Sequence, residues 1–92
     1  RAPRNHFDMV LADPPYELAD EAVAEMVEAL KPVLRDGAVV VVERHRESPE
    51  TAWPEEFTPT GQKLKKRLYG IARMDMAVYA DPDAETVAEG EE

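Results

Sequence analysis

Apolar residues follow two different spacings in the first half of the chain. Residues 7–12 form a short apolar run that predicts a buried strand, and the unbroken Ala and Val run at 38–42 predicts a parallel strand covered on both faces. Between them, apolar residues recur three and four positions apart over 22–34, which predicts a helix laid on a sheet. Strand, helix and parallel strand in series predict a right-handed α/β unit.

Residues at both ends of the helical stretch indicate where the helix begins and ends. Asp20 is the expected N-cap, because a carboxylate at that position accepts a hydrogen bond from the first helical N–H groups. Pro32 cannot continue a regular helix, so we expect the helix to end near Leu30. Gly37 then allows the chain to leave toward the second strand.

The second half of the chain predicts two more strands after a long connection. Residues 47–61 carry three prolines among polar residues and predict an irregular loop. Residues 64–69 and 74–79 predict strands joined by a short turn at Gly70, and the Met and Val positions of 74–79 form the expected core side. Residues 80–92 are acidic and lack aromatic residues, which predicts a disordered tail.

Asp13-Pro14-Pro15-Tyr16 stands directly after the first strand. The prolines end the strand and hold the residues before them extended, at the carboxyl edge where open α/β sheets bind ligands. The Asp13 carboxylate and the Pro14 carbonyl could grip the hydrogens of an exocyclic amino group of a base and turn its lone pair toward a methyl donor. The Tyr16 ring could stack on that base. The same residues also fit a simple strand-exit turn.

The motif and its surroundings resemble a family of methyltransferases. Residues 10–16 resemble the Asp/Asn-Pro-Pro-aromatic motif of amino-methyltransferases that use S-adenosylmethionine. Over residues 5–79, the chain resembles the RsmD-type 16S ribosomal RNA guanine-N2 methyltransferases. The segments that carry this longer resemblance are Phe7–Tyr16, the helical stretch from Ala19, Val39–Arg44, Trp53-Pro54, Arg67–Gly70 and Arg73–Met76.

The resemblance implies a fold, a reaction and roles for the motif residues. The fold would be the carboxyl-terminal half of a Rossmann-like class I methyltransferase, with a mixed sheet and an antiparallel final strand pair. The reaction would be methyl transfer from S-adenosylmethionine to the guanine N2 amino group, in 16S ribosomal RNA or the small ribosomal subunit. Asp13 and Pro14 would hold the amino group, and Tyr16 would stack on the base. We further assign Ala12 and Asp13 to the cofactor side and Pro15 to the substrate side of the motif.

The resemblance also implies a cofactor-binding strand and a glycine turn before the motif. The chain begins at Arg1 rather than at Met, and none of its four glycines lies near another to form a Gly-x-Gly loop. We therefore expect residues 1–79 to be a partial domain whose partner is the N-terminal half of the same domain. The 92-residue chain alone is expected to be inactive.

The charge of the chain bears on an RNA partner. A formal net charge of -9 argues against RNA at first, because Lys and Arg make the phosphate contacts. Six acidic residues lie in 81–92, however, and the remainder carries only -3. Basic clusters at 44–46 and 63–73 could contact phosphate, although the second also fits the solvated side of an edge strand. The candidate contacts are Arg44, Arg46, Lys65 and Arg67.

Two further side chains near the expected binding edge have open roles. Trp53, together with Phe57, could stack on RNA bases or pin its own loop to the domain. Glu43 ends the second strand and could orient a substrate, or it could pair with Arg44 or a loop backbone. For Glu43 we expect the structural role.

Composition argues against several other classes of site. The absence of cysteine excludes a disulfide framework and a thiolate metal site, and it fits a cytoplasmic location. The longest apolar stretch, 37–42, is too short to span a bilayer, and no signal peptide is visible, so no membrane partner is expected. His6 and His45 lie far apart without a carboxylate cluster, so no metal site is expected.

Other functions share parts of this pattern. A DNA adenine-N6 methyltransferase has the same four-residue motif, and a glutamine methyltransferase typically has Asn where Asp13 stands. A non-catalytic RNA-binding or assembly module would use the basic run and the Trp53 loop without methyl transfer.

Overall fold

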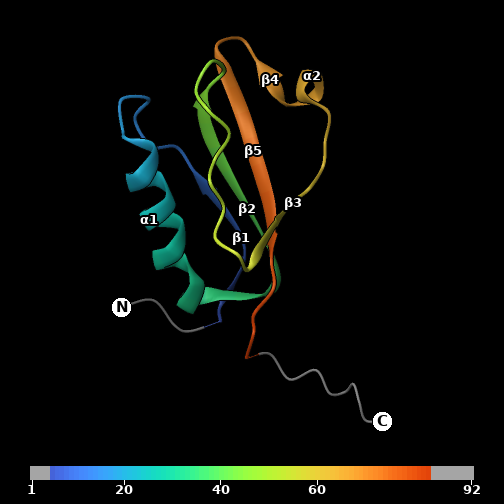
Figure 1. Cartoon of the computed structure of the whole chain (residues 1–92). Helices are drawn as coiled ribbons and strands as arrows, with labels where there is room; N and C mark the ends of the chain where they lie inside the picture. Colours follow the sequence, from blue (N-terminus) through green and yellow to red (C-terminus); the bar gives the residue numbers. More distant parts are fainter. Residues whose placement is uncertain (1–4, 84–92) are drawn as a thin grey trace.

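The computed structural model of the chain describes residues 5–83 as a mixed α/β sheet covered by one helix (Figure 1). The sheet order is β1-β2-β5-β3, with β4 also paired to β5. Strands β1 and β2 are parallel, and the pairs that involve β5 are antiparallel, which confirms the predicted fold class. The elements are β1 (Phe7–Ala12), α1 (Asp20–Leu30), the 3-10 helix η1 (Lys31–Val33), β2 (Leu34–His45), β3 (Phe57–Pro59), α2 (Leu64–Arg67), β4 (Leu68–Tyr69) and β5 (Ala72–Tyr79).

The unit β1-α1-β2 has the predicted boundaries, with one correction at the start of the helix. The strand β1 ends at Ala12, directly before the Asp-Pro-Pro sequence, and α1 ends at Leu30, after which Pro32 lies in η1. Asp20 is the first helical residue and not the N-cap, a position held by Ala19 without a side-chain hydrogen bond. The Asp20 carboxylate accepts a hydrogen bond from Arg44 instead.

Strand β2 is longer than the Ala and Val run predicted, and it begins at Leu34. Its pairing with β1 is interrupted, because Phe7 lies opposite Leu34 whereas Met9 lies opposite Val39. The residues between the two pairs on β2 include Gly37, whose φ of 87° lies in the left-handed region that favours glycine. Gly37 was expected between the helix and the second strand, and it lies instead within β2, where the pairing with β1 is irregular.

The prediction of a strand at 64–69 is wrong for its first four residues. Leu64–Arg67 forms the short helix α2, and only Leu68–Tyr69 pairs with β5. The helical turn carries the Arg67 guanidinium to the buried Asp75, and this tertiary contact overrides the local alternation. The connection at 47–61 is also less irregular than predicted, because Phe57–Pro59 forms β3.

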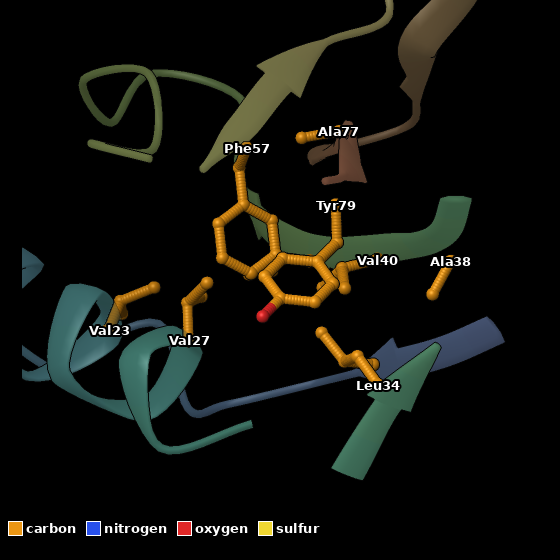
Figure 2. Packing of buried hydrophobic residues seen from close by; sticks show 9 residues of the cluster. Val23, Val27, Leu34, Ala38, Val40, Phe57, Ala77 and Tyr79 are labelled. Carbon is orange, nitrogen blue, oxygen red and sulfur yellow. The ribbon is translucent and has the colours of Figure 1, made fainter. Parts of the chain in front are cut away.

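The core lies between α1 and one face of the sheet. Figure 2 shows Val23 and Val27 of α1 facing Val40 of β2 and Tyr79 of β5. Phe57, the first residue of β3, also belongs to this cluster. Its remaining fully buried members are Leu34, Ala38, Val42 and Ala77.

The predicted core side of β5 is wrong. Asp75, Ala77 and Tyr79 face the core, while Val78 on the other side is 38% exposed. The alternation identified two faces correctly, but α1 covers the face that carries a charged residue. Asp75 is tolerated there because arginine and threonine side chains bond to its carboxylate.

The opposite face of the sheet is open, so the prediction of a buried β1 is wrong for this chain. Met9 is 58% and Leu11 is 73% exposed. Strand β1 pairs only with β2, and it is therefore an edge strand in the described residues. An apolar edge of this kind normally requires a covering element.

The end of the described chain lies against the body of the domain. The Ala80 N–H donates to the Glu56 carbonyl at 2.8 Å, and the Asp81 N–H donates to Asp36 Oδ1 at 2.9 Å. Most of the tail predicted at 80–92 lies outside the described residues. Within residues 5–83, no helix has the length and apolar character needed to cross a membrane.

Candidate active site at the carboxyl ends of β1 and β2

The Asp-Pro-Pro-Tyr motif lies where the two parallel strands end. Ala12 pairs with Val42, so Asp13 and Glu43 follow at the same edge of the sheet. Pro14 is buried while Asp13 is exposed, which leaves the carboxylate accessible on a stiff backbone. A turn in which the Leu18 N–H donates to the Pro15 carbonyl at 3.0 Å then leads into α1.

Tyr16 is fixed by two side chains of β2. Its hydroxyl donates to Glu43 Oε2 at 3.0 Å, and its ring meets the His45 ring edge-on, with centroids 5.4 Å apart. The predicted pairing of Glu43 with Arg44 or a loop backbone is therefore wrong, because the carboxylate holds Tyr16. Two contacts from different directions fix the tyrosine ring better than one.

Two neighbouring hollows share this edge. The first, of about 410 Å³, is lined by the whole motif from Asp13 to Tyr16 and by Glu43. The second, of about 180 Å³, is mostly apolar and lies on the side of the sheet away from α1. Asp13 and Glu43 line both hollows. The remaining residues of the second hollow are Leu11, Ala12, Val41 and Met74.

The electrostatics of the first hollow favour a hydrogen-bond donor as ligand. Burial raises the pKa of the Tyr16 hydroxyl, and its bond to Glu43 and the charges of Glu43 and Asp13 raise it further. The hydroxyl therefore stays protonated at neutral pH and donates. A site with two carboxylates attracts amino hydrogens and repels phosphate.

Arg44 does not lie where a phosphate could meet it. The residue is 2% exposed, and its Nη2 donates to the Leu18 carbonyl and to Asp20 Oδ1, each at 3.1 Å. These bonds join the end of β2 to the segment between the motif and α1, through Leu18, and to the first residue of α1, Asp20. Arg44 is thus placed to hold that segment, and through it Tyr16, against the sheet.

Arg67 is likewise turned inward. Its Nη1 donates to Asp75 Oδ1 and its Nη2 to Glu50 Oε2, each at 2.9 Å. Lys65 and Arg46 are exposed, although Arg46 also donates to the Gly70 carbonyl at 3.0 Å. Of the four predicted phosphate contacts, the structure therefore leaves only these two at the surface.

Trp53 lies against its own loop and the core. Its ring stacks on Phe57 with centroids 5.8 Å apart, and it packs against the buried cluster. The geometry matches the pinning role. The tryptophan also lines a separate pocket of about 270 Å³ beside Arg67 and Asp75, away from the Asp13 motif.

Sequence reasoning missed a buried clamp that holds the loop after β2. Arg73 pairs with Asp75 through Nε at 2.6 Å and through Nη2 at 2.9 Å. Arg73 also donates to the carbonyls of Ser48 and Pro49, and Thr51 donates to Asp75 through both its N–H and its hydroxyl. The signal in the sequence was the Arg-x-Asp spacing, which puts both charges on the core side of β5.

The described residues hold no cluster for a metal ion. Nowhere within 5–83 do three or more His, Cys, Asp or Glu side chains gather in a suitable arrangement.

The fold is similar to parts of longer solved structures. A candidate methylase from Haemophilus influenzae, HI0767, superposes with a TM-score of 0.60 at 25% identity, over 85% of this chain and 47% of that one. A conserved hypothetical protein from Streptococcus pyogenes superposes with a TM-score of 0.62 at 27% identity, over 83% of this chain and 45% of that one. The Escherichia coli candidate methyltransferase YhhF superposes with a TM-score of 0.57, over 86% of this chain and 41% of that one. At 20% identity, this match shows only that the two proteins share a fold. The chain spans less than half the length of each of the three.

Sequence comparison complements these structural matches. No curated protein matches the chain. One family does, over residues 1–78, and this region includes the motif, α1 and nearly all of the sheet. By that match, the chain belongs to the family described as conserved hypothetical protein 95.

Proposed function

We propose that the full-length protein is a cytoplasmic methyltransferase that uses S-adenosylmethionine to methylate the exocyclic N2 amino group of a guanine in 16S ribosomal RNA. The observation that carries the proposal is the exposed Asp13 carboxylate at the end of β1, beside a tyrosine fixed by Glu43. The family match and the name of one similar structure, the candidate methylase from Haemophilus influenzae, support methyl transfer in general. The guanine and the ribosomal RNA follow from the longer resemblance, over residues 5–79, to the RsmD-type methyltransferases.

The motif residues would bind and orient the amino group. The Asp13 carboxylate and the Pro14 carbonyl accept its two hydrogens, so the nitrogen lone pair points out of the plane of the base. Tyr16 stacks on the base in the orientation that Glu43 and His45 impose. When bound, S-adenosylmethionine would supply a methyl group on positively charged sulfur, and the sulfur would keep the electron pair of the broken bond. The amino nitrogen held by Asp13 and Pro14 would take the methyl and release a proton to solvent.

The residues present fit one wall of a cofactor site. Ala12 and Asp13 line the apolar hollow of about 180 Å³ on the open side of the sheet. The described glycines with positive φ, Gly37, Gly61 and Gly70, lie outside the lining of this hollow, so residues 5–83 contribute no glycine turn to it. We propose that the N-terminal half of the same domain completes the site and covers the exposed residues of β1.

Substitution of Tyr16 should weaken binding of the base. Tyr16→Ala in the full-length protein removes the stacking ring, and we expect KM for RNA to rise roughly tenfold. Tyr16→Phe keeps the ring and loses only the bond to Glu43, so its effect should be smaller. Steady-state kinetics on RNA measure both. Unchanged KM and kcat in Tyr16→Ala would contradict the stacking role.

Basic residues at the surface and in the interior should respond differently to salt. Lys65→Ala should reduce the slope of log affinity for RNA against log salt concentration by about 0.7, the value for one lost phosphate contact on a single strand. Arg44→Gln should leave that slope unchanged and lower the free energy of unfolding by about 1–3 kcal/mol, because a buried hydrogen-bonded cation is lost. Equal slopes for Lys65→Ala and wild type would show that Lys65 makes no phosphate contact with RNA.

The test of the function is a methylation assay with the full-length protein and labelled S-adenosylmethionine. The substrates are unmethylated small-subunit RNA, duplex DNA and a protein mixture, and mass spectrometry of the digested products identifies the methylated group. N2-methylguanosine in RNA supports the proposal. N6-methyladenine in DNA would identify a DNA adenine methyltransferase instead, and methylglutamine in protein would identify a glutamine methyltransferase. RNA binding without any methylation would identify a non-catalytic binding module.

A further inference from the structure

Glu43 lies beside Asp13 on the side of the sheet that faces away from α1. It is the residue after Val42, whose partner on β1 is Ala12, and it lines both hollows at this edge. Its cross-strand partner is Met74, whereas the neighbouring Val42 is fully buried against α1. A ligand group held by Asp13 in the first hollow therefore has the Glu43 carboxylate as a neighbour.

The Glu43 carboxylate is held in place without a substrate. Its Oε2 accepts the Tyr16 hydroxyl at 3.0 Å, and Tyr16 is in turn braced by His45. This bond occupies Oε2, and within residues 5–83 no hydrogen bond uses Oε1, which remains as an acceptor on a residue that lines the hollow. A carboxylate can only accept hydrogen bonds, so the group that it meets there must be a donor.

The bases with exocyclic amino groups differ at the ring nitrogen next to the amine. Guanine carries a hydrogen on N1 beside its N2 amino group, while adenine and cytosine have a bare acceptor nitrogen at that place. We propose that Glu43 accepts the N1 hydrogen of guanine while Asp13 holds the amino group, and so selects guanine over bases with an acceptor there. The inference rests on the proposed function and assigns its base specificity to a residue.

The size of the selection follows from the kind of bond. A bond from a donor to a charged acceptor contributes a factor of about 10 to 100 in affinity or rate. A base with a lone pair facing the carboxylate also leaves that charge without its partner, which adds to the rejection. We therefore expect the preference for guanine to reach at least the upper end of that range, a factor of about 100.

The experiment changes the hydrogen-bonding edge of the base and one side chain of the protein. Once mass spectrometry has located the guanine that the full-length protein methylates, synthetic RNA carries either guanine or 2-aminopurine there. 2-Aminopurine keeps the amino group but lacks the hydrogen on N1 and the oxygen on C6, so the Glu43 variant is needed to assign the preference to N1. Wild type should prefer guanine by about 100-fold in kcat/KM. Glu43→Gln keeps an oxygen for Tyr16 and offers an N–H to the base, so the preference should collapse to within a few-fold.

Three variants separate reading of the base from positioning of Tyr16. Tyr16→Phe removes the bond between the two side chains and should retain the preference for guanine, although its overall rate falls. Glu25→Gln, on the exposed face of α1, should match wild type. If Glu43→Gln shows no cooperative melting transition, Glu43→Asp replaces it and should lose rate on guanine with little change on 2-aminopurine.

The outcomes separate this inference from the function beneath it. Equal rates of wild type on the two RNAs, or an unchanged preference in Glu43→Gln, would overturn the role of Glu43 while N2-methylguanosine formation still stands. A preference lost equally in Tyr16→Phe would also overturn it, since Glu43 would then act only through Tyr16. Absence of N2-methylguanosine with every RNA would overturn the proposed function itself.

Discussion

Asp13→Ala in the full-length protein is expected to lower kcat for RNA methylation by about 10²–10³-fold, with a much smaller effect on cofactor affinity. The carboxylate is exposed at the end of β1, and nothing else in the motif offers a charged acceptor to the amino group. A positioned group that interacts with the reacting atoms typically contributes this much to the rate. Single-turnover methylation measures the rate, and calorimetric titration with S-adenosylmethionine measures the affinity.

Two control variants make the Asp13 result specific. Glu17→Ala removes an exposed carboxylate one residue beyond Tyr16 and should leave kcat within about twofold of wild type, because surface charges contribute little. Asp13→Asn keeps an acceptor oxygen, so its kcat should lie between that of wild type and that of Asp13→Ala. Normal turnover in Asp13→Ala would exclude Asp13 from the reaction.

The parts predicted well from the sequence are those set by neighbouring residues. Strand β1 ends at Ala12 because the prolines that follow cannot join the ladder, and α1 ends at Leu30 ahead of Pro32. The motif is local in the same sense, since its place follows from the strand before it and the helix after it. The amino-acid pattern alone therefore places Asp13 and Tyr16 at one edge of the sheet.

The parts predicted poorly depend on partners far along the chain. The role of Glu43 required Tyr16, and the burial of Arg44 required Asp20, in each case more than 20 residues away. Long cationic side chains look alike in sequence whether they face water or fold inward. The basic run was interpreted as a surface for this reason, although Arg67 belongs to the clamp around Asp75.

Which side of a strand faces the core also could not be derived from the pattern alone. In β5, the methionine side looked more apolar than the side with Asp75, yet α1 covers the second. The methionine side of β5 and the exposed residues of β1 lie on the same open face of the sheet. The wrong core side of β5 and the wrong burial of β1 therefore have one cause. The sequence pattern shows two apolar faces, and within residues 5–83 the chain carries a covering helix for only one of them.

Removal of the Asp75 carboxylate is expected to produce the largest loss of stability. Asp75 is 1% exposed and pairs with the buried Arg73, which also holds the loop carbonyls of Ser48 and Pro49. Asp75→Ala leaves that cation buried without its partner, so the free energy of unfolding of the full-length protein should fall by about 3–5 kcal/mol. Denaturation in urea at pH 7 measures the change. Asp8→Ala, which breaks an exposed pair with Arg35, should cost less than about 1 kcal/mol.

The loss in Asp75→Ala should also depend on pH, with a sign fixed by the ion pair. Burial raises the pKa of Asp75, but bonds from Arg73 and Thr51 outweigh it, and the pKa lies below its usual value. A lowered pKa in the folded state gives stability that is fully present above the pKa of the unfolded chain and is lost as pH falls through the folded value. The difference between wild type and Asp75→Ala should therefore be constant from about pH 5 to 7 and shrink below about pH 4. A difference that stays constant into acid would show that the carboxylate acts by its shape and neutral hydrogen bonds, and the clamp on the loop after β2 would then not be electrostatic.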